Sequence, residues 1–345
     1  MRATPHFAWI PGSGVRGERQ AAYQILVASS RKNLIRNIGD MWDSGPIQSG
    51  SHFGVAYSLP GQVSFSTLVA ATGPSAWLPD PFPLARPARP LASNAPYYWK
   101  VRVWNGEGEV SEYSPPAVFE TAMLGPLDWT AKWISFNNAE TLPMFRKAFQ
   151  VDKAETRARA YNSGMGFHEL CLNGQKVGGD VLEPGWTNYR KSCQYVTYDV
   201  TAMLAQGDNA LGVLFGNGMY NVIKKEGGRS SKFGRTFGPN KLILELQIEY
   251  ADGTTAKTLS GGTWKVSCSP IIFLQIYSGK VYDARLELPG WDRTGFDDAA
   301  WSAATEVDGD GRVSRGDIPA TGPYWIRLSC RKGVWGWKII LKKVR

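Results

Sequence analysis

Short runs in which apolar and polar side chains alternate recur along the whole chain and predict β-strands. In residues 97–104 one face is apolar and the other is basic: Tyr97, Trp99, Val101 and Val103 against Lys100 and Arg102. Strand patterns also cover 22–28 and 242–250, and Asn-Gly pairs at 105–106 and 173–174 are typical of tight hairpin turns. The sequence therefore predicts an all-β protein.

The first 122 residues are expected to form a fibronectin type III-like or immunoglobulin-like sandwich, because several short strands fit within about a hundred residues. A strand end is predicted at 41–45. Residues 119–121 are predicted as an edge strand, since Pro115-Pro116 cannot donate to a central ladder. Residues 62–89 are proline-rich and nearly uncharged, and we predict that they are an insertion foreign to the sandwich.

Residues 123–306 are expected to form a second sandwich, of the jelly-roll (galactose-binding-like) type. Its predicted strands cover 129–134, 145–149, 195–200, 209–215 and 242–250, with a hairpin at 173–174 and one helical turn at 202–204. Residues 307–345 are interpreted as a linker and a basic tail, or as the truncated start of a further β domain.

Composition agrees with many short strands and turns: the 345 residues include 38 glycines and 21 prolines, and only 20% are charged. The net charge is +9, but residues 328–345 carry six basic residues and no acid. The basic excess is therefore mostly a property of the tail, and no groove-reading motif accompanies it, so no nucleic-acid partner is expected.

The remaining signals exclude further classes of function. The four cysteines show no metal-ligand or disulfide spacing and are expected to be reduced. His168 lies within a strand pattern and is interpreted as structural. Residues 1–14 lack a signal-peptide core and no run approaches ~20 apolar residues, so we expect a soluble protein without a membrane partner, cytoplasmic if the N-terminus is complete.

Five segments in the second half resemble, in order, the N-terminal jelly-roll domain of bacterial and fungal α-L-rhamnosidases, glycoside hydrolase family 78. These segments are 173–178, 184–189, 198–201, 207–211 and 216–220, of which Pro-Gly-Trp-Thr at 184–187 and Gly-Asn-Gly-Met-Tyr at 216–220 are the most specific. Segments 42–45, 98–104 and 119–121 are similar to the fibronectin-like domain that precedes it, and 282–285 and 290–301 to the exit from the jelly roll. The resemblance covers residues 20–301 outside the proline-rich segment.

This resemblance implies an accessory, carbohydrate-recognition part of a glycoside hydrolase. In the family the catalytic carboxylates lie on a helical (α/α) toroid further along the chain, and no helix-period segments of that length are present here. No catalytic residue is therefore expected in this chain. Two other functions stay open: a structural or protein-interaction module without sugar binding, and an active hydrolase with carboxylates in a sandwich cleft.

The conspicuous acids have structural interpretations beside the catalytic one. Asp199 is expected to cap the turn at Thr201, and Asp283 to pair with Arg285. Two positions also depart from the family pattern: Met219 stands where tryptophan is usual, and Lys280 where an acid is usual.

Some domains of this jelly-roll class are similar to rhamnose-binding modules that use calcium. The matching positions imply a sugar site of Asp180, Trp186, Asn217 and Tyr220, with Asp180 and Asn217 as ligands for calcium. No cofactor is strictly required, and the implied partner is a rhamnose-containing glycan. The alternative is that Trp186 and Tyr189 are core aromatics and Asn217 is a turn residue.

Overall fold

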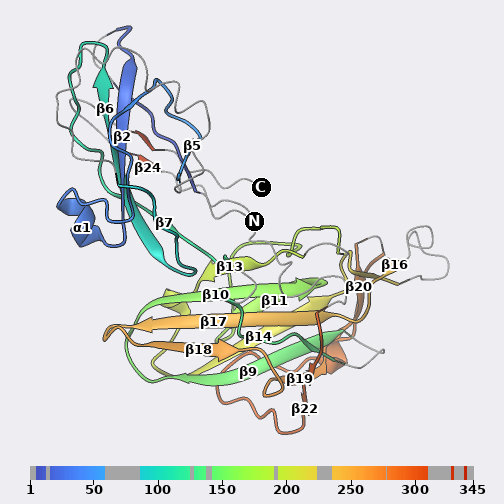
Figure 1. The fold of residues 1–345 in the computed structure, drawn as a ribbon. Helices are drawn as coiled ribbons and strands as arrows, with labels where there is room; N and C mark the ends of the chain where they lie inside the picture. The colour runs from blue at the N-terminus through green and yellow to red at the C-terminus, as the bar shows by residue number, and fades with distance from the viewer. Residues whose placement is uncertain are drawn as a thin grey trace. The chain divides into compact units, whose positions relative to one another are not determined.

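The computed structural model describes residues 5–12, 16–58, 86–124, 128–136, 142–189, 193–223, 235–276, 278–309, 328–329 and 338–339 (Figure 1). The chain divides into two compact units, Met1–Leu124 together with Gly322–Arg345, and Gly125–Thr321. The described residues contain one α-helix, α1 (Arg31–Ile35), and the rest of the regular structure is almost entirely strand. The predicted all-β class is confirmed. No helix in these ranges is long and apolar enough to cross a membrane.

The first unit is built on an antiparallel sheet in the order β3-β2-β6-β7, with β4 also paired to β2 and a separate pair formed by β1 and β5. The strands are β1 (His6–Phe7), β2 (Gln20–Ala28), β3 (Trp42–Asp43), β4 (Ile47–Gln48), β5 (Val55–Ala56), β6 (Pro96–Asn105) and β7 (Ala117–Glu120). β7 ends the sheet, as the proline pair before it predicts.

The core of the first unit follows the alternation read from the sequence. The apolar face of β6 lies in this core: Tyr97, Trp99, Val101 and Val103. Phe7 packs against Trp99, with 4.8 Å between the ring centroids. This core joins the sheet to the β1-β5 pair and makes the unit a β-sandwich.

Residues 62–85 of the predicted insertion lie outside the described residues, but its last four residues do not. The Arg86 backbone exchanges hydrogen bonds of 3.0 and 3.2 Å with Asp43 at the end of β3. Ala88 is buried, and the Tyr57 hydroxyl donates to the Arg89 carbonyl at 2.7 Å. Residues 86–89 are therefore part of the sandwich, because they satisfy polar groups of its edge.

The second unit is a sandwich of two antiparallel sheets, in the orders β13-β10-β17-β8-β23, with β18 also paired to β17, and β12-β11-β14-β9-β19-β22. Their strands are β8 (Ile134–Ser135), β9 (Pro143–Val151), β10 (Glu155–Met165), β11 (Phe167–Leu172), β12 (Gln175–Lys176), β13 (Val196–Asp199), β14 (Gly207–Gly216), β17 (Lys241–Tyr250), β18 (Thr255–Leu259), β19 (Lys265–Cys268), β22 (Ser302–Ala303) and β23 (Thr305–Glu306). This is the jelly-roll-type sandwich that the sequence predicts.

Shorter elements complete the described chain. Three hairpins are formed by β15 (Asn221–Val222) with β16 (Arg235–Thr236), β20 (Ile271–Gln275) with β21 (Gly279–Tyr282), and β24 (Leu328–Ser329) with β25 (Lys338–Ile339). Single 3-10 turns occur at Thr201–Met203 and Ala284–Leu286. The rest of the predicted linker and tail, 310–327 and after 329, lies outside the described residues apart from β25.

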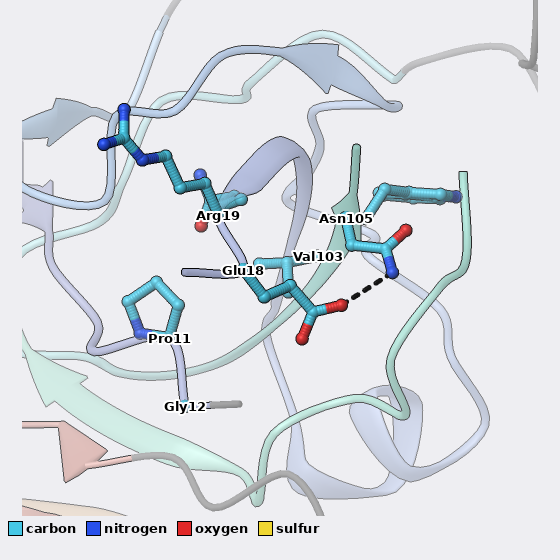
Figure 2. Close-up of a pocket in the computed structure, with 8 residues that line it drawn as sticks. Pro11, Gly12, Glu18, Arg19, Val103 and Asn105 are labelled. Carbon is cyan, nitrogen blue, oxygen red and sulfur yellow. Dashed lines mark hydrogen bonds between the residues drawn. The ribbon is translucent and has the colours of Figure 1, made fainter. Parts of the chain in front are cut away.

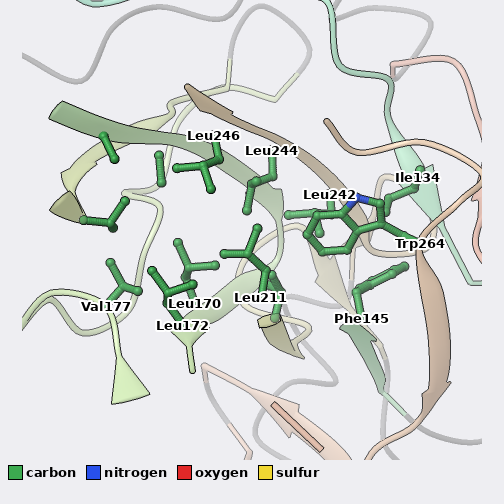
Figure 3. Packing of buried hydrophobic residues seen from close by; sticks show 14 of the residues in the cluster. Ile134, Phe145, Leu170, Leu172, Val177, Leu211, Leu242, Leu244, Leu246 and Trp264 are labelled. Carbon is green, nitrogen blue, oxygen red and sulfur yellow. The ribbon is translucent and has the colours of Figure 1, made fainter. Parts of the chain in front are cut away.

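The main core of the second unit lies between its two sheets. Leu242, Leu244 and Leu246 of β17 face Leu170 of β11 and Leu211 of β14 (Figure 3). This follows from the period of two, because alternate residues of each strand point to the same face. The turn between β11 and β12 uses the predicted Asn-Gly pair at 173–174, both with positive φ.

The strand predicted at 129–134 is wrong for most of its length, because only Ile134 belongs to a strand, β8. The backbone N–H groups of Thr130 and Ala131 donate to the carboxylate of Glu245, at 2.9 and 3.2 Å, and not to a neighbouring strand. Trp129 instead packs edge-on against Tyr195 on the outer face of the β13-β10-β17 sheet. Alternation alone does not distinguish such a covering segment from a strand.

Candidate functional site

The segment 178–189 between β12 and β13 carries two of the four predicted sugar-binding residues. It is attached to the sandwich at several points. The Val177 N–H donates to the Leu170 carbonyl at 2.8 Å, and the His168 N–H to the Glu183 carbonyl at 2.9 Å. Pro184 is buried beside this second contact. The segment is therefore a held loop, and we call residues 180–186 within it the apolar loop.

The apolar loop presents large hydrophobic side chains to solvent. Val181, Leu182 and Trp186 are 75%, 60% and 70% exposed, while Asp180 and Glu183 are half-buried. Trp186 is therefore a solvent-facing aromatic surface and not a core residue. An amphipathic ligand such as a pyranose can bind a flat aromatic face through its C–H groups and a carboxylate through its hydroxyls.

Tyr220 lies apart from solvent, in an aromatic cluster. It is completely buried, its ring stacks on Phe237 at 5.8 Å, and Tyr189 approaches it edge-on at 5.3 Å. Burial raises the pKa of Tyr189 to about 12. In this arrangement Tyr220 offers no ring face to a sugar, so the expected role of Tyr220 as an aromatic contact gives way to a role in packing. Tyr189 is the core aromatic that the alternative interpretation named.

Asn217 is also buried and already has partners. Its N–H donates to the Leu274 carbonyl at 2.9 Å, and its Oδ1 accepts from Asn221 Nδ2 at 3.1 Å. These contacts are those of a turn residue, as the alternative interpretation expects. The structure thus exposes Trp186 on the apolar loop with Asp180, and covers the other two predicted residues.

Calcium takes six to eight oxygen ligands, usually with several carboxylates. Among the described ranges no group of three or more His, Cys, Asp or Glu side chains is placed to hold a metal ion. Asn217 Oδ1 is covered and engaged by Asn221. Asp180 and Asn217 therefore do not assemble a calcium shell here, and no step of the proposed function uses the ion.

The other conspicuous acids have the structural roles predicted for them. Asp199 accepts from the Thr201 N–H at 3.1 Å and pairs with Arg159 at 2.7 Å. The Arg285 guanidinium donates to the Asp283 carboxylate at 2.6 Å and holds the pKa of Asp283 at about 2. The lowered pKa of Asp283 suits an ion pair and not a general acid.

His168 is a buried core histidine, as predicted. Burial lowers its pKa to about 4, and its Nε2 lies 2.7 Å from Asn162 Nδ2. Its ring stacks on Phe215 of β14. At neutral pH it is an uncharged packing residue next to the point where the apolar loop is attached.

The first unit has a small cavity (Figure 2). It lies between the segment 11–20 and the end of β6, and Glu18 accepts a 2.7 Å hydrogen bond from Asn105 at its wall. Its volume is about 40 Å³, which is room for only a few water molecules. A monosaccharide does not fit there.

Val181 and Leu182, the exposed aliphatic side chains of the apolar loop, are not among the residues that the sequence predicts for the site. The available signal was the position of two branched aliphatic residues between Gly178-Gly179 and Pro184, in a segment with no strand period. Of the two departures from the family pattern, Lys280 lies over the ring of Tyr282, with its Nζ 4.9 Å from the centroid. Met219 is half-buried next to Tyr220.

Two family models match the chain. "Alpha-L-rhamnosidase N-terminal domain" matches residues 153–319, and "Rha78A-like, N-terminal immunoglobulin domain" matches residues 1–67 and 82–125. The unmatched residues between the two parts of the second model, 68–81, fall within the predicted insertion.

The similar proteins of known name are also α-L-rhamnosidases. An α-L-rhamnosidase of Formosa agariphila is 34% identical over 92% of this chain and 33% of its own length. One from Alteromonas sp. (strain LOR) is 31% identical over 91% of this chain and 32% of its own length. The chain thus spans about a third of the length of these relatives.

Solved structures with a similar fold are also α-L-rhamnosidases. The α-L-rhamnosidase of Dictyoglomus thermophilum is 30% identical, with a TM-score of 0.74 over 95% of this chain and 34% of that one. The Streptomyces avermitilis α-L-rhamnosidase, solved in complex with L-rhamnose, also has a TM-score of 0.74, over 92% of this chain and 44% of that one. At 24% identity the second likeness supports the fold alone.

Proposed function

The chain belongs to the α-L-rhamnosidase family, of which it carries the N-terminal immunoglobulin-like and N-terminal domains, and from this we propose that its function is carbohydrate recognition. The proposed ligand is a rhamnose-containing glycan, and the proposed site is the apolar loop. Trp186 contacts the C–H face of the sugar, and Asp180 accepts hydrogen bonds from its hydroxyls.

The observation that carries the proposal is the exposure of Trp186, at 70%, on a segment that is held by the Glu183 carbonyl before it and by the buried ring of Tyr189 after it. A large aromatic side chain exposed on a held loop is typical of a binding site, because none of the described residues packs over most of its surface. The half-buried Asp180 supplies a carboxylate within the same loop. Stacking on one aromatic and a few hydrogen bonds predicts weak binding, with a Kd in the millimolar range or just below it.

Isothermal titration with L-rhamnose and with an α-linked rhamno-oligosaccharide tests the proposal. Trp186→Ala should weaken binding at least tenfold. Phe53→Ala is the matched control, because Phe53 is an equally exposed aromatic, at 73%, in the first unit. Saturable binding that is unchanged in Trp186→Ala would place the sugar elsewhere, and no binding by the unmodified chain would refute carbohydrate recognition.

A structural or protein-interaction module is the second candidate. It is favoured by the hairpin β20-β21, where Ile272, Val281 and Tyr282 are all exposed strand residues. Exposed apolar strand residues are typical of surfaces that another polypeptide covers. Under this alternative the chain does not bind any rhamnose-containing glycan, so the same titration separates the two functions.

A further inference from the structure

Two aliphatic side chains of the apolar loop have no role in the proposed function as stated so far. Resting on that function, we propose that Val181 and Leu182 determine the specificity of the site and select sugars that carry a methyl group in place of a hydroxymethyl group. L-Rhamnose is such a sugar. L-Mannose is its matched counterpart, because it differs only by a hydroxyl on that carbon.

The exposure of these side chains is unusual within this protein. Three of the five most exposed large apolar side chains among the described residues lie in the apolar loop: Val181, Leu182 and Trp186. The two attachment points of the loop are backbone hydrogen bonds that do not depend on Val181 or Leu182 side chains. Most of the surface of the Val181 and Leu182 side chains is exposed among the described residues, and a ligand can cover it.

The backbone conformation at Leu182 is one that disfavours leucine. Its φ is +59°, in the left-handed region where glycine or asparagine is favoured and a branched aliphatic residue is disfavoured. A leucine at this position gains neither backbone preference nor burial. Contact with a ligand is a role that its side chain can fill.

The polar neighbours complete an amphipathic surface. Asp180 precedes the aliphatic pair and Glu183 follows it, and both are half-buried carboxyl residues. The two carboxylates can accept hydrogen bonds from the ring hydroxyls of a sugar. The aliphatic pair favours a methyl group over a hydroxymethyl group, because a hydroxyl placed against it loses its hydrogen bonds to water and gains no hydrogen-bond partner. Covering one methyl group changes affinity about fourfold. We therefore expect L-mannose to bind about 3–10-fold more weakly than L-rhamnose.

The test compares L-rhamnose and L-mannose by titration calorimetry on the full chain and on the double variant Val181→Thr, Leu182→Asn. Threonine has the shape of valine, and asparagine tolerates the left-handed backbone, so both changes add polarity without removing the fold. Val281→Thr is the control, because it makes the same change at a residue of β21 that is 40% exposed.

The expected result is a preference for L-rhamnose that falls to less than twofold in the double variant and is kept in the control. Equal affinity for the two sugars in the unmodified chain overturns this inference and leaves sugar binding standing. A preference that survives in the double variant also overturns it. If neither sugar binds, the proposed function fails, and the specificity fails with it.

Discussion

The buried carboxylate of Glu245 provides the sharpest test of how the second unit is held together. Its side chain is fully covered, and it lies on the outer face of β17 and not in the core between the sheets. One oxygen accepts from the Thr130 and Ala131 N–H groups. The other accepts from Lys257 at 2.7 Å and from Gln247 at 2.8 Å. The change Glu245→Gln keeps the shape and removes the charge.

The size of the effect follows from these contacts. A glutamine can still accept from the backbone through its oxygen, but its amide then faces the Lys257 and Gln247 donors, so two acceptor contacts are lost. Hydrogen bonds to charged groups contribute about 1.5–3 kcal/mol each, and Lys257 can regain water because it is partly exposed. We expect the free energy of unfolding to fall by about 2–4 kcal/mol. For a unit of about 200 residues this lowers the Tm by about 4–16 °C.

The pH dependence gives a second readout with a definite sign. Burial alone would raise the pKa of Glu245, but hydrogen bonds from Lys257, Thr130 and Gln247 outweigh it and the pKa is lowered. A lowered pKa in the folded state means that the stabilisation is present above the unfolded value, about 4.3, and is lost as the pH falls through the folded value. The stability difference between the unmodified chain and Glu245→Gln should therefore be full at pH 7 and shrink below about pH 4.

Differential scanning calorimetry at several pH values measures both effects. Glu249→Gln is the matched control on the same strand, because Glu249 pairs with Arg157 at 2.6 Å but is partly exposed, so its loss should cost at most about 1 kcal/mol. A Glu245→Gln variant that melts within 1 °C of the unmodified chain at pH 7 would refute the reasoning, as would a difference that grows on acidification.

Three further outcomes are expected. Arg146→Met should lower the free energy of unfolding by about 2–4 kcal/mol in urea titrations, because buried Arg146 donates to the carbonyls of Trp291 and Arg293 and pairs with Asp298; a loss under 1 kcal/mol would contradict this. Asp180→Ala should weaken L-rhamnose binding at least tenfold, and a chelator should leave the affinity of the unmodified chain unchanged. If the chelator abolishes binding and added calcium brings it back, a calcium ion takes part in the site. The purified chain should not hydrolyse an aryl α-L-rhamnoside, because its conspicuous acids Asp199 and Asp283 are engaged with Arg159 and Arg285, and turnover that stays with the chain through purification would count against that.

The strands could be predicted because most of them present one face to a core. β6 and β17 each place alternate residues in a core, so their apolar period of two is visible in the sequence. The segment at 129–134 shows the same period for another reason, since Trp129 and Trp133 are buried while the backbone binds a carboxylate. Nothing in the local sequence of that segment reveals a partner more than a hundred residues away.

The two buried charged residues were equally hidden. Glu245 and Arg146 occupy strand positions where the alternation indicates a polar, solvent-facing side chain. They are buried because segments from elsewhere in the chain fold over the outer faces of the sheets. Alternation predicts which residues of a strand point away from the main core. It does not predict which of these residues are buried under another segment of the chain.

The candidate site was predicted in part. The Pro-Gly-Trp-Thr segment directed attention to Trp186, and the structure exposes that side chain. Tyr220 could be a sugar contact or a core residue as far as its own segment shows, and its burial depends on Tyr189 and Phe237, which lie far from it in sequence. Aromatic residue type alone does not separate these roles.

The Glu245 contacts also decide how the second unit responds to tension. Thr130 and Ala131 are among its first described residues, and Lys132 adds a 2.9 Å hydrogen bond to the Ser260 carbonyl. A force that pulls the chain from its N-terminal side meets these short-range contacts before it reaches the strands of the sheet. Rupture under force should therefore begin by peeling this segment from β17, at a threshold that drops in acid when the carboxylate gains its proton.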